Sequence, residues 1–225
     1  MRTSPATATH RAACYVCFKP QVACICASIE PVANRTGIVI LQHPRERFHP
    51  IGTTRIARLA LQRVRVEACA PWVEGDALRC GVPDGAAVLY PDPTASDLAA
   101  LSGSDRPHHL VLLDATWFNA KKMHEAHAWL RALPHVRLTP AGPSRYRIRR
   151  EPKPHYIGTL EAIVDALRIL EPQTRGLDGL LRTFDAMIAR QAAYTDQRSP
   201  MSAVAAGCQR SDWPIRPGMG SPTAT

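Results

Sequence analysis

A run of apolar residues from Leu110 to Leu113 leads directly into Asp114 and then into a segment with helical character. A continuous apolar run bounded by polar residues is typical of a buried strand in a parallel sheet. Asp114 would then lie at the carboxyl end of that strand. Because ligands of open α/β sheets bind at the carboxyl ends of their strands, this carboxylate is the first candidate for a functional site.

Short apolar runs and helical patterns alternate along the rest of the chain. The patterns predict strands at 37–43, 85–90, 110–114 and 135–139, and helices at 53–66, 118–133, 159–170 and 177–194. This alternation predicts an α/β domain with a largely parallel sheet. The chain has no Gly-x-Gly-x-x-Gly turn after a strand and no Walker-type phosphate loop, which argues against a conventional dinucleotide site.

The composition fits a globular chain with a core and two polar ends. Of the 225 residues, 45% are apolar, which is ample for a packed core. We expect a flexible leader at 1–13, a knuckle at 14–30, a main domain at 31–197 and a disordered tail at 198–225, where Ser, Pro, Gly and Ala predominate. No stretch approaches the roughly 20 apolar residues that span a bilayer. The first residues also lack the apolar segment of a signal peptide, so we expect a cytoplasmic protein that does not associate with a membrane.

Four cysteines lie close together near the amino terminus, with the spacing Cys-x2-Cys-x6-Cys-x-Cys. Four thiolates bind many structural zinc ions, and two close pairs can supply them from two turns. The chain lacks a secretory signal, which disfavours disulfides, but disulfides, free thiols and an iron–sulfur cluster stay open as alternatives. The metal ligands that this pattern predicts are Cys14, Cys17, Cys24 and Cys26. The isolated cysteines, which we expect to be inert, are Cys69, Cys80 and Cys208.

Basic residues are concentrated in two parts of a chain whose formal charge is +9. Residues 35–65 hold seven arginines and one acid, and residues 121–153 hold nine basic and two acidic residues. This clustering suggests a polyanionic partner, with ordinary solvated surface as the alternative, and arginine suits planar contacts to phosphate. Helical spacing would place Arg55, Arg58, Gln62 and Arg65 on one face of the helix predicted at 53–66. Together with a tyrosine that could stack on a base, the candidate RNA contacts are His43, Arg45, Arg47, Arg55, Arg58, Arg65, Lys121, Lys122, Arg145, Tyr146, Arg147, Arg149 and Arg150.

Asp114 and Thr116 also have a simpler interpretation, because both are good helix N-cap residues and a helix is predicted to follow. Trp117 could likewise belong to the core. The order of the residues favours a functional role. Asp114-Ala115-Thr116-Trp117, followed by Ala120-Lys121-Lys122-Met123, resembles the defining motif of the DTW-domain family, with Ala115 at a variable position where the family often has glycine.

The resemblance extends over about residues 14 to 190. Besides the cysteine cluster, it rests on Leu41-Gln42-His43-Pro44-Arg45-Glu46, Leu89-Tyr90-Pro91, Tyr146-Arg147-Ile148-Arg149 and Thr159-Leu160-Glu161-Ala162. Several separated motifs in the family's order are more specific than any one of them. DTW-domain proteins are aminocarboxypropyltransferases that modify uridine in tRNA, and the chain resembles their bacterial branch.

The resemblance implies a SPOUT-like α/β fold with a knotted C-terminal region. It also implies transfer of the 3-amino-3-carboxypropyl group of S-adenosylmethionine to N3 of a uridine, with release of methylthioadenosine. The residues that it implies for binding S-adenosylmethionine are Leu89, Tyr90, Pro91, Leu113, Asp114, Thr116, Trp117, Thr159, Glu161 and Ala162. The expected partners are tRNA and S-adenosylmethionine, with zinc as a structural ion and no obligate protein partner.

Asp114 is the predicted catalytic residue. A carboxylate within hydrogen-bond reach of N3 could take up the proton that leaves during attack; binding the cofactor is the alternative role. Thr159 is predicted as the N-cap of its helix. The negative charge of Glu161, in the first turn, is expected to stabilise the N-terminus of that helix. Two other functions stay open: a SPOUT-type RNA methyltransferase, which would release S-adenosylhomocysteine, and a zinc-bearing RNA-binding module without catalysis.

Overall fold

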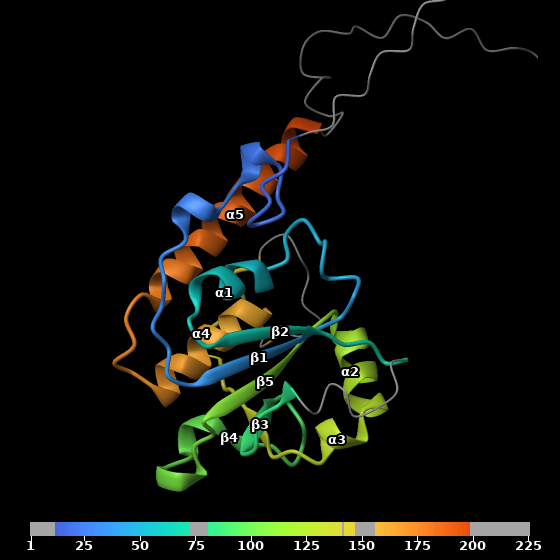
Figure 1. Cartoon of the computed structure of the whole chain (residues 1–225), viewed down its shortest axis with the longest axis vertical. Helices are drawn as coiled ribbons and strands as arrows, with labels where there is room; N and C mark the ends of the chain where they lie inside the picture. Colours follow the sequence, from blue (N-terminus) through green and yellow to red (C-terminus); the bar gives the residue numbers. More distant parts are fainter. Residues whose placement is uncertain (1–11, 73–80, 141, 147–155, 199–225) are drawn as a thin grey trace, which may run out of the picture.

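The computed structural model describes residues 12–72, 81–140, 142–146 and 156–198. The leader expected at 1–13 and the tail expected at 198–225 lie almost entirely outside these ranges. So do Cys80, Cys208, Arg147, Arg149 and Arg150. The described residues form a central sheet with helices on both of its faces (Figure 1). Among these residues, no helix combines the length and the apolar character needed to cross a bilayer.

Six parallel strands form the sheet, in the order β2-β1-β5-β3-β6-β4. The strands are β1 (Gly37–Gln42), β2 (Val64–Ala68), β3 (Ala86–Leu89), β4 (Ser96–Asp97), β5 (His109–Asp114) and β6 (His135–Arg137). The strand that ends in Asp114, β5, lies between β1 and β3. The prediction of an α/β domain with a largely parallel sheet is confirmed, and the carboxyl ends of the strands meet at one edge.

Alternation along the buried strands divides the core between the two faces of the sheet. Ile38 and Ile40 of β1 belong to one cluster of apolar side chains, whereas Val39 and Leu41 belong to the other. The first cluster is covered by α1 (Thr54–Ala60), α4 (Thr159–Leu170) and α5 (Leu177–Arg198), and the second by α2 (Trp117–Ala126) and α3 (Ala128–Arg131). Both faces of the sheet are therefore buried, as is usual for parallel sheets.

Two of the predicted helices differ from those in the structure. The helix predicted at 53–66 ends at Ala60, and the prediction is wrong beyond that residue because 64–68 form strand β2. Val64 and Val66 pair in parallel with β1, so tertiary pairing prevails over a local helical pattern. The helix predicted at 118–133 is interrupted at His127, whose side chain is buried beside Cys69.

The N-terminal cysteine segment is irregular, with only short 3₁₀ turns at η1 (Gln21–Ala23) and η2 (Cys26–Ser28); two further turns, η4 (Leu98–Ala100) and η5 (Gly103–Asp105), precede β5. The cysteine segment lies along the second half of α5 (Figure 1). Arg58 of α1 donates to the carbonyl of Val16, and Arg190 of α5 donates to the carbonyl of Cys24. Cys17 shares a core cluster with α1 and α5, so the segment is continuous with the main domain.

Glu171, just after α4, ties that helix to the residues that precede β1. Its carboxylate, in a residue that is 1% exposed, accepts hydrogen bonds from the N–H groups of Arg35 and Thr36 and from Thr174 Oγ1. Burial alone would raise the pKa of Glu171. The hydrogen bonds, first that from Thr174, outweigh burial and hold the pKa below its usual value.

We expect Glu171 to stabilise the fold at neutral pH and to lose this effect in acid. Because its pKa is lower in the folded than in the unfolded chain, the contribution is complete above the unfolded value of about 4.3 and declines as the pH falls toward the folded value. Glu171→Gln should lower the free energy of unfolding at neutral pH and weaken its dependence on acid. Urea unfolding at a series of pH values measures both effects, and an unchanged acid dependence would contradict the assignment.

Candidate active site

A pocket opens at the carboxyl edge of the sheet, where the loops that follow β3 and β5 meet the start of α4. Gly52, Thr53 and Tyr146 close it from another side. The sheet topology predicts a ligand at this edge. Of the residues that the resemblance implies for S-adenosylmethionine, the structure brings into this lining Leu89, Tyr90, Pro91, Leu113, Asp114, Trp117, Thr159 and Ala162.

Asp114 reaches the pocket from the centre of the sheet with both carboxylate oxygens hydrogen-bonded. Thr159 Oγ1 donates to Oδ1 at 2.8 Å, and Gln42 Nε2 donates to Oδ2 at 2.8 Å. Gln42 is the register partner of Asp114 across β1 and β5, so parallel pairing sets the two side chains next to each other. Asp114 is 8% exposed and lines the pocket. The two donors fix the orientation of its carboxylate.

Thr116, and not Asp114, caps helix α2. Thr116 Oγ1 accepts a hydrogen bond from the N–H of Asn119 at 3.3 Å, and Thr116 lies outside the pocket lining. The N-cap of α4 is Gly158, so the prediction that Thr159 caps this helix is wrong. Thr159 is instead the first helical residue, and its hydroxyl is free to point at Asp114.

Trp117 forms part of the pocket wall and stacks on Tyr156. The two ring centroids are 3.8 Å apart, and the ring planes are inclined by 27°. Both rings line a second pocket, to which Arg137 and Leu138 contribute, and Trp117 lines the first pocket as well. The two pockets share several residues, including Tyr90 and Trp117, and therefore form one continuous cleft. Tyr156 carries no motif that sequence analysis could have used to place it here.

Glu161 holds the segment 144–146 against the start of α4. Its carboxylate accepts hydrogen bonds from Ser144 Oγ at 2.7 Å, from the N–H of Arg145 at 2.6 Å and from the N–H of Gly158 at 2.8 Å. The last bond is the glutamate half of a capping box. Neither pocket includes Glu161 in its lining. Glu161 therefore acts on the cleft by positioning Gly158 and Tyr146, which do line it.

Glu161→Gln should destabilise the fold by about 1–3 kcal/mol, the usual penalty for leaving a buried polar group without its partner. In the wild-type chain three donors share the two carboxylate oxygens of Glu161. A glutamine would offer these donors a single oxygen, and its amide N–H₂ group would face donors. Chemical denaturation measures the effect. Glu125→Gln, at an exposed position of α2, is the matched control and should change the stability by less than about 0.5 kcal/mol. Equal stability of the two variants would contradict the positioning role.

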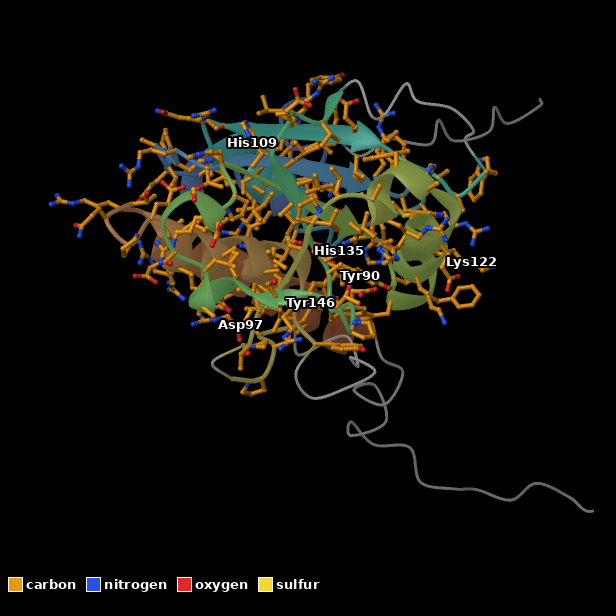
Figure 2. All side chains as sticks on the ribbon, turned by 90° about the horizontal axis from the view of Figure 1, so that it is seen from below. Tyr90, Asp97, His109, Lys122, His135 and Tyr146 are labelled. Atoms are coloured by element: carbon orange, nitrogen blue, oxygen red, sulfur yellow. The ribbon has the colours of Figure 1, made fainter. Side chains whose placement is uncertain are left out.

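Two histidines that the sequence analysis did not assign to the site support Tyr90. The Tyr90 ring stacks on His124, with centroids 4.4 Å apart, and His124 Nε2 lies 2.7 Å from His135 Nε2. His135 Nδ1 lies 2.7 Å from the carbonyl oxygen of Leu133, to which it donates, and in a neutral His135 ring Nε2 is then the acceptor for His124. Burial and then the proximity of His135 lower the pKa of His124, which favours the neutral form of this ring. Figure 2 labels Tyr90, which follows β3, and His135, which begins the neighbouring strand β6.

Three of the candidate RNA contacts are buried, namely His43, Arg55 and Tyr146. Arg55 donates to the carbonyl of Arg47, and the Tyr146 hydroxyl donates to the carbonyl of Ile51. Through these hydrogen bonds the buried side chains of Arg55 and Tyr146 hold the backbone of the segment 47–51 in place. Their types suggested a surface role, but residue type and sequence position alone do not reveal burial.

The exposed candidates lie on separate elements. Arg58 and Arg65, predicted to share a helix face, lie on α1 and β2, and that shared face is wrong because α1 ends at Ala60. Arg65 pairs with Glu67, and Arg145 pairs with Asp185. The other exposed candidates are Arg45, Arg47, Lys121 and Lys122, the last of which projects outward from α2 (Figure 2).

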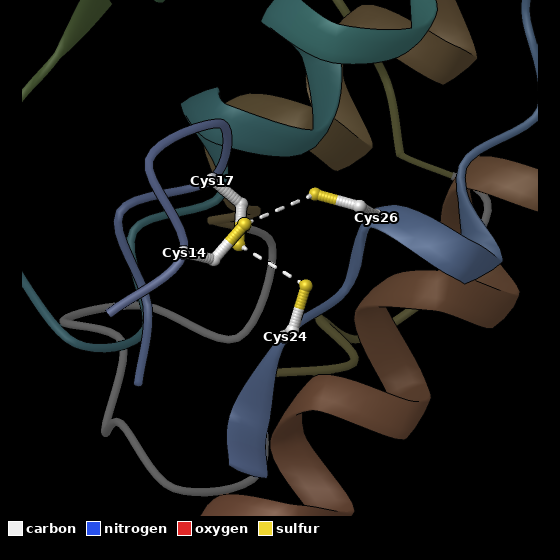
Figure 3. A group of neighbouring side chains, drawn as sticks. All are labelled: Cys14, Cys17, Cys24 and Cys26. Carbon is white, nitrogen blue, oxygen red and sulfur yellow. Dashed lines mark hydrogen bonds between the residues drawn. The ribbon is translucent and has the colours of Figure 1, made fainter. Parts of the chain in front are cut away.

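The four N-terminal cysteines bring their sulfurs together beside α1 and α5 (Figure 3). Sγ of Cys14 lies 3.7 Å from Sγ of Cys26, Sγ of Cys17 lies 3.8 Å from Sγ of Cys24, and all four lie within 4.8 Å of one another. Sulfurs bound to one zinc ion at about 2.3 Å in a tetrahedron are about 3.8 Å apart. The spacing fits one metal ion. Disulfide bonds join sulfurs at about 2.05 Å, and in the structure none of these four cysteines forms one.

The charges around the sulfurs also fit a metal ion. Backbone hydrogen bonds, chiefly that from Cys17, lower the pKa of Cys14 to about 6, whereas burial and the neighbouring thiols raise the pKa of Cys26 to about 12. Four thiols this close cannot all ionise without a cation among them. Lys19 and Arg55 are buried near Cys17, and in the described part of the chain neither pairs with a carboxylate. Four thiolates around a divalent ion would supply the negative charge that these cations lack.

Together the fold and the site define a parallel α/β domain with a ligand cleft at the carboxyl edge of its sheet and a cysteine cluster that could hold a metal ion. The DTW domain family matches residues 11–192, and the chain belongs to this family.

Three similar proteins carry closely related names. The proteins named tRNA-uridine aminocarboxypropyltransferase 2 from Drosophila melanogaster and Mus musculus are 30% and 28% identical to this chain, over 180 and 199 residues. These matches cover 75% and 84% of this chain and 70% and 67% of the relatives. The Arabidopsis thaliana protein named tRNA-uridine aminocarboxypropyltransferase A is 24% identical over 223 residues, with 84% of each chain covered. No solved structure matches the chain.

Proposed function

We propose that this protein transfers the 3-amino-3-carboxypropyl group of S-adenosylmethionine to N3 of a uridine in tRNA and releases methylthioadenosine. The observation that carries the proposal is the Asp114 carboxylate, which two hydrogen-bond donors hold at the wall of a cleft. Membership of the DTW domain family and the names of the similar proteins support the same reaction.

In this reaction Asp114 serves as the general base. S-adenosylmethionine supplies an electrophilic carbon, whose bond to sulfur breaks as N3 attacks, so that the bonding electron pair leaves on methylthioadenosine. N3 carries a proton that has to leave in the same process. Asp114 accepts this proton while Thr159 and Gln42 hold its carboxylate in place, and it returns the proton to solvent when the products depart.

The proposed reaction demands that the amino-acid arm of S-adenosylmethionine, rather than its methyl group, faces the uridine. Correct orientation of two bound reactants can supply several kcal/mol toward the barrier. The two adjoining pockets allow two substrates to lie in contact, with Asp114 in the first and Arg137 in the second. The stacked pair of Trp117 and Tyr156, where the two pockets meet, offers an aromatic surface on which a nucleobase can stack.

The cysteine cluster holds zinc in this proposal, with Cys14, Cys17, Cys24 and Cys26 as its ligands. A site with four protein ligands has no open position for a substrate, so the ion is structural. The described cysteines form no disulfide bonds, which suits a cytoplasmic location, where disulfides are rare. The SPOUT-like knot is a further part of the proposal. Residues 157–159 support it, because they line the same pocket as the loops that follow β3 and β5.

Product analysis tests the proposed reaction. The full chain, incubated with S-adenosylmethionine and with tRNA from cells that lack this protein, should form methylthioadenosine and an aminocarboxypropyl-modified uridine in equal amounts. Release of S-adenosylhomocysteine with a methylated nucleoside would show an RNA methyltransferase instead. RNA binding without either product would leave a non-catalytic module, and the proposed function would be wrong.

A further inference from the structure

A groove separate from the catalytic cleft lies between the cysteine segment, the segment 48–50 and α5. Its volume of about 580 Å³ falls within the range of about 300–1,000 Å³ that is typical of ligand sites. Three strongly exposed apolar side chains line it: Phe18 (57% exposed), Val22 (91%) and Phe48 (71%). Single exposed apolar residues are ordinary, but several that line one groove indicate an interaction site.

The groove also carries positive charge. Lys19, Arg55 and Arg190 line it, and no acidic residue of the described chain does. Lys19 and Arg55 are buried at its base, whereas Arg190 is exposed on α5. The buried pair lies beside the cysteine cluster, so Arg190 is the groove cation that complements an anion approaching from solvent.

Further arginines extend this charge over the two phenyl rings. The guanidinium carbon of Arg47 lies 5.3 Å from the centroid of the Phe48 ring, and that of Arg58 lies 5.7 Å from the centroid of the Phe18 ring. Exposed aromatic rings beside cations are the combination that binds unpaired nucleotides, because the ring stacks on a base while the cation faces a phosphate.

One segment of the chain separates the groove from the catalytic cleft. Gly52 and Thr53 line the cleft. Phe48 and Arg55, within a few residues of them, line the groove. An RNA strand with one nucleotide in the cleft can therefore cross this segment and place a nearby nucleotide in the groove.

We propose that the groove binds an unpaired nucleotide of the tRNA substrate, close in sequence to the uridine that enters the cleft. The base stacks on Phe18 and Phe48, and the backbone phosphate faces Arg190. This inference rests on the proposed function, since it places the RNA of that reaction. An apolar peptide would cover the rings but would leave the exposed cations Arg47, Arg58 and Arg190 without a complementary charge, which favours the nucleotide.

Fluorescence anisotropy of the full, zinc-loaded chain with a labelled oligouridine and with labelled tRNA tests the groove. The double variant Phe18→Ala/Phe48→Ala should bind oligouridine about 5- to 100-fold more weakly, the effect of losing base–aromatic stacking. Phe118→Ala is the matched control. Phe118 is 67% exposed and has Lys122 Nζ at 4.3 Å from its ring centroid, but it lies on α2 and should be dispensable for this binding.

Salt dependence separates stacking from charge in the same assay. Loss of the rings should leave the slope of log K against log salt concentration unchanged, whereas Arg190→Gln should reduce that slope by about 1. Arg190 also donates to the carbonyl of Cys24, so zinc content and melting temperature are measured for every variant to show that the cysteine segment is intact.

Two outcomes would overturn the inference: wild-type affinity of the double variant for both RNAs, or no binding of oligouridine by the wild-type chain. The first would assign the groove to another occupant, such as an apolar peptide.

A measurement of product formation distinguishes a failure of this inference from a failure of the proposed function. If the wild-type chain forms methylthioadenosine with tRNA, the double variant should raise KM for tRNA at unchanged kcat and unchanged affinity for S-adenosylmethionine. If it forms none, the proposed function fails, while anisotropy still reports on the groove.

Discussion

Asp114→Asn should lower kcat for aminocarboxypropyl transfer by a factor of about 10²–10⁴, the usual contribution of a positioned general base. Asparagine has the same shape and can still accept a hydrogen bond from Thr159, and Gln42 can turn its amide to accept from the new N–H₂ group. The fold should therefore be kept, so that the change isolates the loss of a proton acceptor. Methylthioadenosine formation at saturating substrate concentrations gives the measurement.

Asp97→Asn is the matched control for this substitution. Asp97 also ends a strand of the same sheet, β4, and its position is labelled in Figure 2. Its carboxylate accepts hydrogen bonds from the N–H of Ala99 and from the hydroxyl of Thr139, and it lies outside the lining of both pockets. An asparagine there can accept the bond from the N–H of Ala99 with its carbonyl oxygen and donate its N–H₂ group to the hydroxyl of Thr139, so kcat should stay at the wild-type value.

The affinity for S-adenosylmethionine decides between the two roles considered for Asp114. If the carboxylate takes up the proton of N3, calorimetry should give nearly the same Kd for S-adenosylmethionine in Asp114→Asn and in the wild-type chain. If the carboxylate instead binds S-adenosylmethionine, Kd should rise together with the loss of rate. A variant that retained the wild-type kcat would show that Asp114 is not the base.

The strands that carry this site are predictable from sequence because they are buried on both faces. β1, β3 and β5 each read as a continuous apolar run, and the structure has a strand at each. β2 differs because it is an edge strand whose residues are only partly buried. Its identity depends on pairing with β1, which no local pattern contains, so the sequence analysis extended the preceding helix through it.

The candidate site divides in the same way between local and distant determinants. The position of Asp114 follows from its own strand, and the roles of Thr116 as a cap and of Trp117 beside the strand end are local. The hydrogen bond from Thr159 to Asp114 joins residues 45 positions apart, and it requires α4 to begin at the carboxyl edge of the sheet. Glu161 is recognisable as a residue of a helix start. The hydrogen bond that it accepts from the N–H of Arg145 depends on the packing of segment 144–146 against α4, which no local pattern contains.

Replacing Cys17 by serine should abolish zinc binding and lower the melting temperature by roughly 10 °C or more. Cys17 is fully buried, and a hydroxyl replaces one of four thiolate ligands. Without the ion, Lys19 and Arg55 stay buried without an opposite charge, and breaking a buried pair costs about 3–5 kcal/mol. In a chain of this length about 1 kcal/mol corresponds to about 2–4 °C. Elemental analysis and calorimetry give the two measurements.

Cys69→Ser is the matched control, because Cys69 is also fully buried but lies beside His127, outside the cysteine cluster. It should lose some stability and keep its zinc. Bound iron with visible absorption in the wild-type chain would favour the iron–sulfur alternative. A metal-free wild-type chain that melts at the same temperature as the zinc-loaded chain would contradict a structural ion.

The effect of the ion should also reach α5 and the groove. Thr183 and Arg190 of α5 donate to the carbonyls of Ser28 and Cys24, so the loss of zinc should reduce hydrogen-exchange protection in α5 around these two residues. Because Phe18 and Arg190 line the groove, oligouridine binding should weaken in Cys17→Ser and not in Cys69→Ser. Asp114 and its hydrogen bonds belong to the sheet edge and to α4, so binding of S-adenosylmethionine should persist. A metal-free chain that bound the cofactor but held RNA poorly would place the ion's role in substrate recognition.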